Sequence, residues 1–184
     1  DHAPTITAPK AHMIYTFPLA LKHSDEFGFI RQSFQAVRTL PNLCTHHRDS
    51  DEPDHEGCEA LQKLVRLRLE EDLIDEEALR LLAVKSGGIP VWLVFLVRDS
   101  ALFAMERGGD RIEVQDVELA LRDLRHDTVA PLRRGDYEVL RQRHKDHKLT
   151  TDEAEKRLLY NGALIEYPNE KPWCDAHPVL WEIL

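Results

Sequence analysis

The sequence predicts a mainly α-helical protein that ends in a small β-hairpin. Three features support this prediction. In several segments apolar residues recur every three or four positions, which places them on one face of a helix. Gly87-Gly88 followed by Pro90 separates two of these segments, and glycines then proline end one helix and begin the next. Near the C-terminus, two short runs of β-forming residues flank residues 168–171, as in a hairpin.

The first 57 residues have weaker patterns. Residues 1–10 are polar and contain proline, so we expect them to be loose. Residues 12–21 are rich in β-forming side chains and predict a strand. Residues 25–40 have helical spacing and end before a proline, so they predict a helix. Residues 43–44 are expected to open another short strand. Residues 46–57 have no apolar periodicity and are expected to form an exposed loop.

Four helices are predicted next, over residues 59–125. The first covers residues 59–72, and Asp75 is expected to cap the second, which ends at Gly87-Gly88. The third covers residues 90–105 and stops at the glycines after Arg107. Because residues 91–97 are all apolar, we expect this helix to be buried on most of its circumference. Val114, Val117, Leu121 and Leu124 mark the fourth helix.

The remaining segment predicts two more helices, the hairpin and a closing helix. Residues 127–134 contain a proline and are the expected connector between two domains. Residues 136–148 are amphipathic, and Thr150 or Thr151 is the expected cap of the following helix. That helix should end at Asn161-Gly162. The hairpin strands are predicted at residues 163–167 and 172–175, and the closing helix at residues 179–184.

Composition indicates a globular protein. Of 184 residues, 42% are hydrophobic and 31% charged, with a net charge of −9, which does not favour disorder. No apolar run approaches the roughly 20 residues that span a bilayer, so no membrane partner is expected. The three cysteines are widely spaced, which fits a reducing cytoplasm.

Several motifs in order resemble one protein family. Ser86-Gly87-Gly88 with Pro90, an apolar helix and then Ile112, Asp116, Val117, Glu118 and Ala120 look like the helical lid of AAA+ ATPases of the origin-recognition type and their bacterial relatives. Residues 158–167 and 173–180 resemble the hairpin and last helix of the winged-helix domain that follows such lids. The resemblance covers most of the chain from about Met13 onward.

This resemblance implies a domain plan. Residues 1–55 would be a remnant of an α/β nucleotide-binding core with a loop, residues 56–127 a four-helix lid, and residues 128–184 a winged helix. The phosphate-binding Gly-x-x-x-x-Gly-Lys-Ser/Thr pattern is absent from the sequence. We therefore expect the C-terminal portion of a larger ATPase, without activity of its own. ATP and Mg²⁺ would belong to that parent protein, and no cofactor is expected for this chain.

The resemblance also suggests nucleotide-lid candidates. Thr16 matches a polar sensor position on a late core strand, although an ordinary strand residue is the simpler interpretation. The other candidates are the residues of the turn between the second and third predicted helices, which we call the glycine corner, and one arginine: Gly87, Gly88, Pro90 and Arg98. In AAA+ lids the next helix usually begins with an arginine that reaches the γ-phosphate. Here Val91 holds that position and can make no such contact.

The C-terminal segment offers candidates for winged-helix contacts: Arg141, Arg143, Lys145, Lys148 and Lys171. However, residues 128–184 carry ten acidic and nine basic side chains, or −1 net, and residues 51–86 carry eleven acidic and five basic, or −6 net. The charge therefore favours a protein partner over DNA. Trp173 is expected to be a buried aromatic residue, and His177 a hydrogen-bonded structural histidine.

Potential zinc ligands gather in one segment: Cys44, His46, His47, His55 and Cys58. Paired Cys-x-x-Cys or His-x-x-x-His elements are absent from it, and acidic residues lie between the candidates. A solvated loop is the simpler interpretation, so no metal site is predicted.

The function expected from these observations is that of a regulatory and interaction module of a nucleotide-dependent switch ATPase, located in the cytoplasm. Gly87-Gly88 and residues 127–134 are the expected pivots, and a protein partner or self-association is expected. Two alternatives remain at this point. One is a DNA-binding winged-helix protein whose upstream helices form a dimerisation bundle. The other is a small zinc-binding adaptor.

Overall fold

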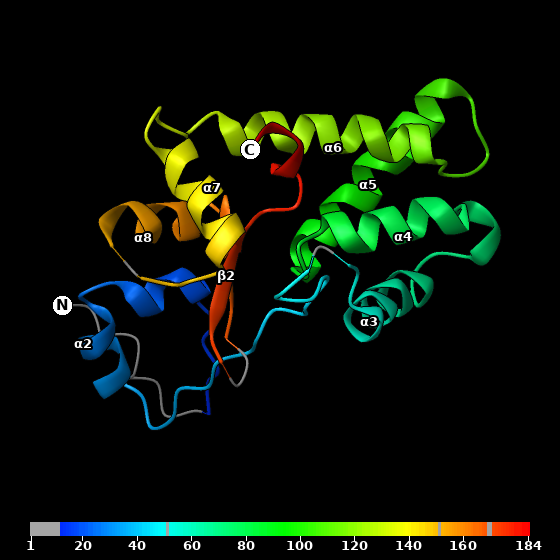
Figure 1. Ribbon diagram of the computed structural model, residues 1–184. Coiled ribbons are helices and arrows are strands. Elements are labelled where there is room, and N and C mark those ends of the chain that lie inside the picture. The colour runs from blue at the N-terminus through cyan, green and yellow to red at the C-terminus, as the bar shows by residue number, and fades with distance from the viewer. Residues whose placement is uncertain (1–11, 51, 151, 169–170) are drawn as a thin grey trace.

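The computed structural model describes residues 12–50, 52–150, 152–168 and 171–184. These residues form a mainly helical protein with a two-stranded antiparallel hairpin, as the sequence predicts. In Figure 1 the helices α3 to α6 gather on one side, and α7 and α8 lie on the other. Strand β2 runs between the two groups and leads to the C-terminus beside α6.

The predicted four-helix segment is confirmed as helical. It consists of α3 (His55–Arg66), α4 (Glu76–Lys85), α5 (Pro90–Arg107) and α6 (Val114–Val129), with a short 3₁₀ turn η2 (Glu71–Leu73). Helix α3 begins earlier than predicted because the Asp54 carboxylate accepts a hydrogen bond from the Gly57 amide at 2.8 Å and caps the helix.

The glycine corner has the predicted backbone conformation. Gly87 and Gly88 have φ values of 63° and 79°, which glycine adopts without the steric cost that a Cβ imposes. Pro90 is the first residue of α5, where its fixed φ suits the helix and its missing N–H is not needed.

Helix α5 is less buried than the sequence predicts. Leu93 and Leu96 are buried, but Val91, Val94 and Phe95 are 52%, 49% and 42% exposed. The helix packs mainly against α6, with further contacts to α4 and α3. These neighbours cover one side of it and leave the other in solvent. An apolar composition around a helix does not specify which face receives a partner.

The break between the helical cluster and the C-terminal segment falls slightly later than predicted. Helix α6 continues through Asp127 to Val129, so the connector is reduced to residues 130–135. The start of α6 is fixed by a capping box between Glu113 and Asp116. Arg107 also donates to Asp116, and this hydrogen bond holds the pKa of Asp116 below its usual value despite burial.

The C-terminal segment contains α7 (Asp136–Asp146), α8 (Glu153–Tyr160), β1 (Leu164–Tyr167), β2 (Trp173–Ala176) and a final 3₁₀ turn η3 (Trp181–Ile183). The strands pair antiparallel from Leu164–Ala176 to Tyr167–Trp173, which confirms the hairpin. The predicted closing helix is only the η3 turn. Gly162 has φ 73° after α8, as the Asn-Gly pattern indicates.

The cap of α8 differs from the prediction. Asp152 is the N-cap residue, and its carboxylate accepts from the amides of Ala154 and Glu155, both at 2.9 Å. Thr150 instead donates its hydroxyl to Glu155 at 2.7 Å. Thr151, the other predicted cap, lies outside the described residues. Both Thr150 and Asp152 are favourable cap types, so sequence alone could not choose between them.

The predicted N-terminal elements are mostly wrong. Residues 12–17 form no strand, and a 3₁₀ helix η1 (Leu19–His23) follows them. The helix predicted over residues 25–40 is only α2 (Phe27–Gln32). Apart from an isolated bridge between His46 and Pro53, the described residues before α3 make no strand pairing. The expected α/β core remnant is therefore not seen in them, because β-forming composition produces a strand only where a partner strand is available.

One buried apolar cluster joins the two helical groups. It runs from Leu61, Leu82 and Leu93 in the helical cluster to Leu140 and Leu180 in the C-terminal segment. Within the described part of the chain, no helix is long and apolar enough to cross a membrane.

Candidate functional site

The glycine corner lies in close contact with two distant parts of the chain. A Cβ placed on Gly88 would lie 1.7 Å from the carbonyl oxygen of Leu43, and one on Gly87 would lie 2.3 Å from Cδ1 of Ile165. The Leu43 amide donates to the Gly88 carbonyl at 3.1 Å. The two glycines therefore serve close packing as well as the turn.

Tyr167 connects the corner to the hairpin. This residue is fully buried, and its hydroxyl donates to the Gly87 carbonyl at 3.0 Å. Burial, with a smaller contribution from the nearby Asp175 carboxylate, raises the pKa of Tyr167 far above its usual value. The hydroxyl therefore keeps its proton and remains a donor to the corner.

His177 also lies against the corner, with Nε2 3.6 Å from where a Cβ of Gly87 would stand. It is 1% exposed, and its Nδ1 accepts a hydrogen bond from the Val179 amide at 3.2 Å. This confirms the prediction of a hydrogen-bonded structural histidine. Burial first, and the positive charge of Lys85 second, lower the pKa of His177 from 6.5 to about 3. Lys85 itself donates to the Pro178 carbonyl at 3.3 Å.

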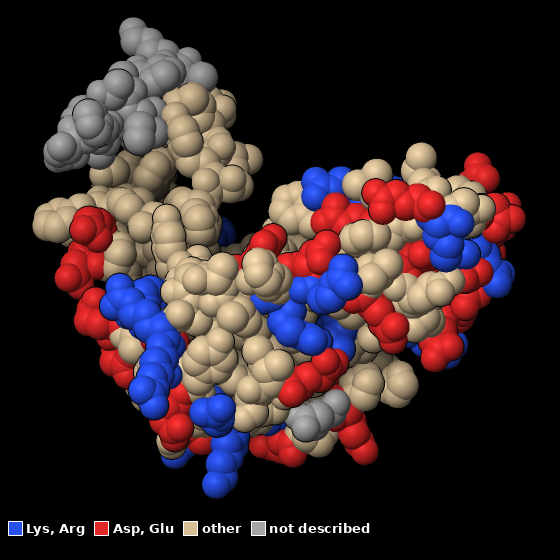
Figure 2. Space-filling view, turned by 90° about the horizontal axis from the view of Figure 1, so that it is seen from above, with Lys and Arg blue, Asp and Glu red and all other residues tan. Residues whose placement is uncertain are grey.

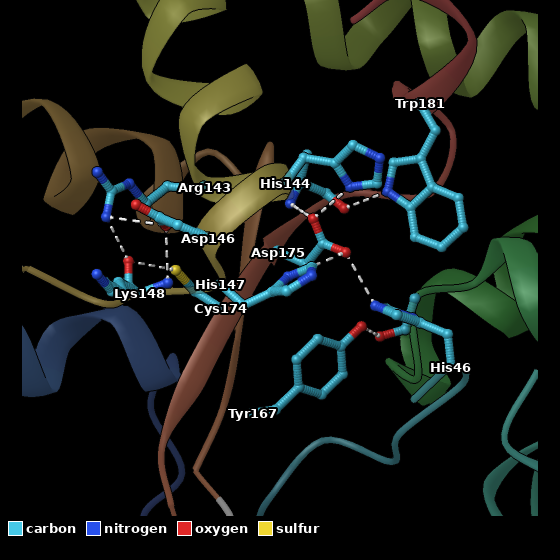
Figure 3. Close-up of polar contacts among 12 residues, drawn as sticks. His46, Arg143, His144, Asp146, His147, Lys148, Tyr167, Cys174, Asp175 and Trp181 are labelled. Atoms are coloured by element: carbon cyan, nitrogen blue, oxygen red, sulfur yellow. Dashed lines mark hydrogen bonds and ion pairs between the residues drawn. The ribbon is translucent and has the colours of Figure 1, made fainter. Parts of the chain in front are cut away.

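A second polar centre surrounds the Asp175 carboxylate on β2 (Figure 3). His46 approaches one oxygen through Nε2 at 2.9 Å, and His144 of α7 approaches the other through Nδ1 at 2.8 Å. His147, which ends α7 with φ 52°, lies 3.8 Å from the carboxylate. Three imidazoles from two distant segments thus face one acid whose side chain is fully buried.

The charge state of Asp175 follows from these contacts. Burial alone would raise its pKa, but the hydrogen bonds from His144 and His46 outweigh burial and hold the pKa below the usual value. The acid is therefore a buried carboxylate at neutral pH. Such a group requires donors on both oxygens, and the two imidazoles provide them.

Aromatic rings enclose His46. Its imidazole is perpendicular to the rings of Tyr167, Trp173 and Trp181, with centroid distances of 5.7, 5.2 and 4.9 Å. Tyr167 and Trp173 stack on each other at 4.3 Å. The prediction of an exposed loop at residues 46–57 is therefore wrong at His46, which is 1% exposed, whereas the expected burial of Trp173 is confirmed at 4%.

The contacts around Asp175 are difficult to predict from the sequence. His46 lies in a polar stretch, and Asp175 is 129 residues away from it. The available signal was the density of aromatic and histidine residues after Pro172, which indicates a packed environment without naming the partner of Asp175.

The nucleotide-lid candidates do not converge. Thr16 is exposed and outside any strand, whereas Gly87 and Gly88 are buried under their own chain. Pro90 is exposed at the start of α5. Arg98 points into solvent from the middle of α5, donates to Asp99 at 2.7 Å and lies over the Phe95 ring. These residues do not form a common pocket.

Two of the five basic candidates in the C-terminal segment, Arg141 and Arg143, are already paired. Arg141 lies near Glu138 and donates to the Leu184 carbonyl at 2.7 Å. Arg143 is 13% exposed and pairs with Asp146 and Glu155, both at 3.2 Å. Lys145, Lys148 and Lys171 are exposed. On α8, Lys156 pairs with Glu153, and Arg157 pairs with Asp136.

The wider surface shows the same mixture of charges. Figure 2 shows lysine and arginine side chains interspersed with aspartate and glutamate on the face it presents, and neither sign occupies a broad area alone. A polyanion needs a locally positive surface, and this face does not provide one.

Two of the potential zinc ligands, His46 and Cys58, are used in other contacts. His46 bonds to Asp175, and the buried Cys58 thiol donates to the Thr45 carbonyl at 3.4 Å. Burial, aided by Asp54, raises the pKa of Cys58 to about 11, which disfavours the thiolate that zinc requires. Among the described residues, no group of three or more such side chains is placed to hold a metal ion.

An open cleft of about 400 Å³ lies between η1 and α8. Its wall carries charges of both signs, with Lys156 and Arg157 beside Asp25, Glu26 and Glu153. This mixture does not select a particular ligand.

The fold and site define a mainly helical protein in which a glycine corner packs against a hairpin that carries a buried histidine–carboxylate centre. Protein-family models, curated proteins and solved structures give no match to this chain.

Proposed function

We propose that this chain is the regulatory and interaction module of a nucleotide-dependent switch ATPase, with residues 56–127 as an AAA+-type lid and residues 128–184 as a winged helix. The resemblance of the corner and tail motifs supports this proposal. The four helices with a glycine corner, followed by two helices and a hairpin, are compatible with it.

The main structural support for this proposal is the contact between the corner and the hairpin. Tyr167 and Ile165 of β1 meet Gly87, and Lys85 at the end of α4 holds the Pro178 carbonyl after β2. A rotation of the helical cluster therefore moves the hairpin with it. This coupling is what a lid needs in order to transmit a change of state to the domain that follows it.

The contact also changes the expected position of the pivot. The sequence suggests Gly87-Gly88, yet both glycines are buried against Leu43 and Ile165. Bending there would open packed contacts and break the Tyr167 hydrogen bond. We therefore propose that the helical cluster and the hairpin rotate together as one body.

In this proposal, nucleotide binds to the parent protein and not to this chain alone. The candidates Thr16, Gly87, Gly88, Pro90 and Arg98 do not surround a shared space, so they do not fit a nucleotide by themselves. ATP and Mg²⁺ would be held upstream of this chain, and the module would respond through its contacts with that part.

Hydrogen exchange of the full-length parent, with ATP and without nucleotide, tests the proposal. We expect changes at surface segments of residues 12–184 that meet the upstream core, and none at the amides of Gly87, Gly88 and Ile165. A parent variant that cannot bind ATP is the control and should show no change. Absence of any change in residues 12–184 would refute the switch, and a change confined to the corner would refute the one-body rotation.

A further inference from the structure

In the described structure, the exposed face of α5 carries a row of apolar side chains with Arg98 at its centre. Six side chains form this row, which we call the α5 stripe: Val91, Val94, Phe95, Arg98, Leu102 and Met105. Its apolar members are between 42% and 72% exposed. They recur at the three- and four-residue spacing of one helix face. Contiguous exposed apolar surface of this kind marks an interaction site more often than single exposed residues do.

Apart from Phe95, the apolar members of the stripe are spaced symmetrically about Arg98. Val94 and Leu102 each lie four residues from Arg98, and Val91 and Met105 each lie seven residues from it. If two copies of α5 cross antiparallel at Arg98, Val91 meets Met105 of the other copy, and Val94 meets Leu102. A twofold interface requires this relation, in which residue i contacts j and j contacts i.

The charges at the centre fit the same arrangement. Arg98 and Asp99 already pair within one chain at 2.7 Å, and their side chains are 62% and 39% exposed. Two copies bring two arginines and two aspartates together, with no net charge. Each Arg98 can then keep its own aspartate or exchange it for the aspartate of the second copy.

The ends of α5 are also complementary in an antiparallel pair. The first turn of α5 contains no acidic residue, and Glu106 is exposed at the last turn. In the antiparallel arrangement, Glu106 of one copy lies near the N-terminus of the other α5, where the helix dipole favours a negative charge.

We propose that the α5 stripe is a homodimer interface, covered by the same stripe of a second copy in antiparallel orientation. The spacing, the central charges and the helix ends all select a second copy of this chain as the occupant. The interface needs no nucleotide, so the two proposals are tested independently. Absence of a dimer would not contradict the proposed switch function, and absence of a nucleotide response would not contradict the dimer.

Analytical ultracentrifugation of the chain over a range of concentrations is the first test. We expect a reversible dimer with twice the mass of one chain. Val94→Asp and Leu102→Asp should each raise the dissociation constant at least about tenfold, because each buries a carboxylate in apolar contact. The matched control is Leu40→Asp, at an 88% exposed leucine outside α5, which should keep the wild-type dissociation constant. Circular dichroism confirms that each variant is folded.

Disulfide cross-linking tests the orientation independently of these variants. Arg98→Cys should cross-link to itself at the axis, whereas Val91→Cys alone should not. A mixture of Val91→Cys and Met105→Cys chains should form the mixed dimer. The wild-type chain, with Cys44, Cys58 and Cys174, gives the background under the same oxidant. A single-chain mass at all concentrations, a dimer insensitive to Val94→Asp, or self-linking of Val91→Cys would each overturn the proposal.

Discussion

Asp175 and His177 lie two residues apart near the end of β2, and both are almost fully buried, yet burial leaves them in different charge states. Asp175 keeps its negative charge because His46 and His144 donate to its two oxygens. His177 faces the glycine corner and Lys85 rather than an acid, so its imidazole stays neutral. The partner available to each side chain, and not burial alone, decides its protonation.

This difference predicts the pH dependence of stability at the residue scale. The pKa of His177 is about 3 when folded, against 6.5 ordinarily. As pH falls below 6.5, the His177 side chain becomes protonated in the unfolded chain but stays neutral in the folded chain. The free energy of unfolding therefore decreases progressively towards pH 3. Between pH 7 and pH 5 this one residue should cost about 2 kcal/mol.

The variant His177→Asn isolates this contribution. An asparagine side-chain oxygen can still accept from the Val179 amide, but it does not titrate. Urea unfolding at pH 7 and pH 5 should show that the variant loses about 2 kcal/mol less than wild type over this interval. Equal losses in the two proteins would show that His177 is not the source.

At the scale of elements, helix ends with similar backbone angles have different roles. Gly88 and Gly108 have φ values of 79° and 77° and both follow helices. A Cβ on Gly108 would meet nothing within 4 Å, whereas one on Gly88 would overlap the Leu43 carbonyl. Gly108 therefore only ends a helix, whereas Gly88 also permits a tertiary contact.

The pair Gly88→Ala and Gly108→Ala should therefore separate backbone strain from close packing. Gly108→Ala should cost about 1 kcal/mol, the price of a left-handed alanine. Gly88→Ala adds an overlap with rigid backbone and should cost more than about 3 kcal/mol. Chemical unfolding of both variants measures the difference, and similar costs would show that the corner can move away from residue 43.

At the scale of the whole molecule, the shared core is the main feature. The sequence divides the chain at residues 127–134, but α6 passes through the start of that connector and the buried cluster continues on both sides of it. His46 extends the same packing to the N-terminal segment through Asp175 and the surrounding rings. The described residues after about position 43 therefore form one packed unit.

A single cooperative unfolding transition is expected from this packing. In the variant Trp92→Phe, tryptophan fluorescence reports only Trp173 and Trp181 in the C-terminal segment. Circular dichroism reports mainly the helices, most of which precede residue 130. The two probes should give the same urea midpoint, and two separate midpoints would instead support independent domains.

Patterns within one segment allowed much of the architecture to be predicted. The apolar spacing predicted the helices α4 to α6, and the glycines and proline at positions 87–90 predicted where α4 ends and α5 begins. The runs around residues 168–171 predicted the hairpin. These features depend on residues within a few positions of each other, so the sequence contains all the information they need.

The predictions that failed depend on long-range contacts. The strand expected at residues 12–21 lacks a partner strand among the described residues, and the third helix of the cluster is exposed along the side that α6 does not cover. His46 was expected in solvent because its neighbours in sequence are polar, yet it lies against three aromatic rings from residues 167–181.

The helical class, the glycine corner and the terminal hairpin can be predicted from the amino-acid sequence alone, because backbone preferences and apolar periodicity act over a few residues. The three-dimensional structure is needed to show that imidazoles of residues 46 and 144 bind Asp175, that the corner packs against β1, and which face of α5 stays exposed. These outcomes follow from how distant segments pack, and no local pattern specifies that packing.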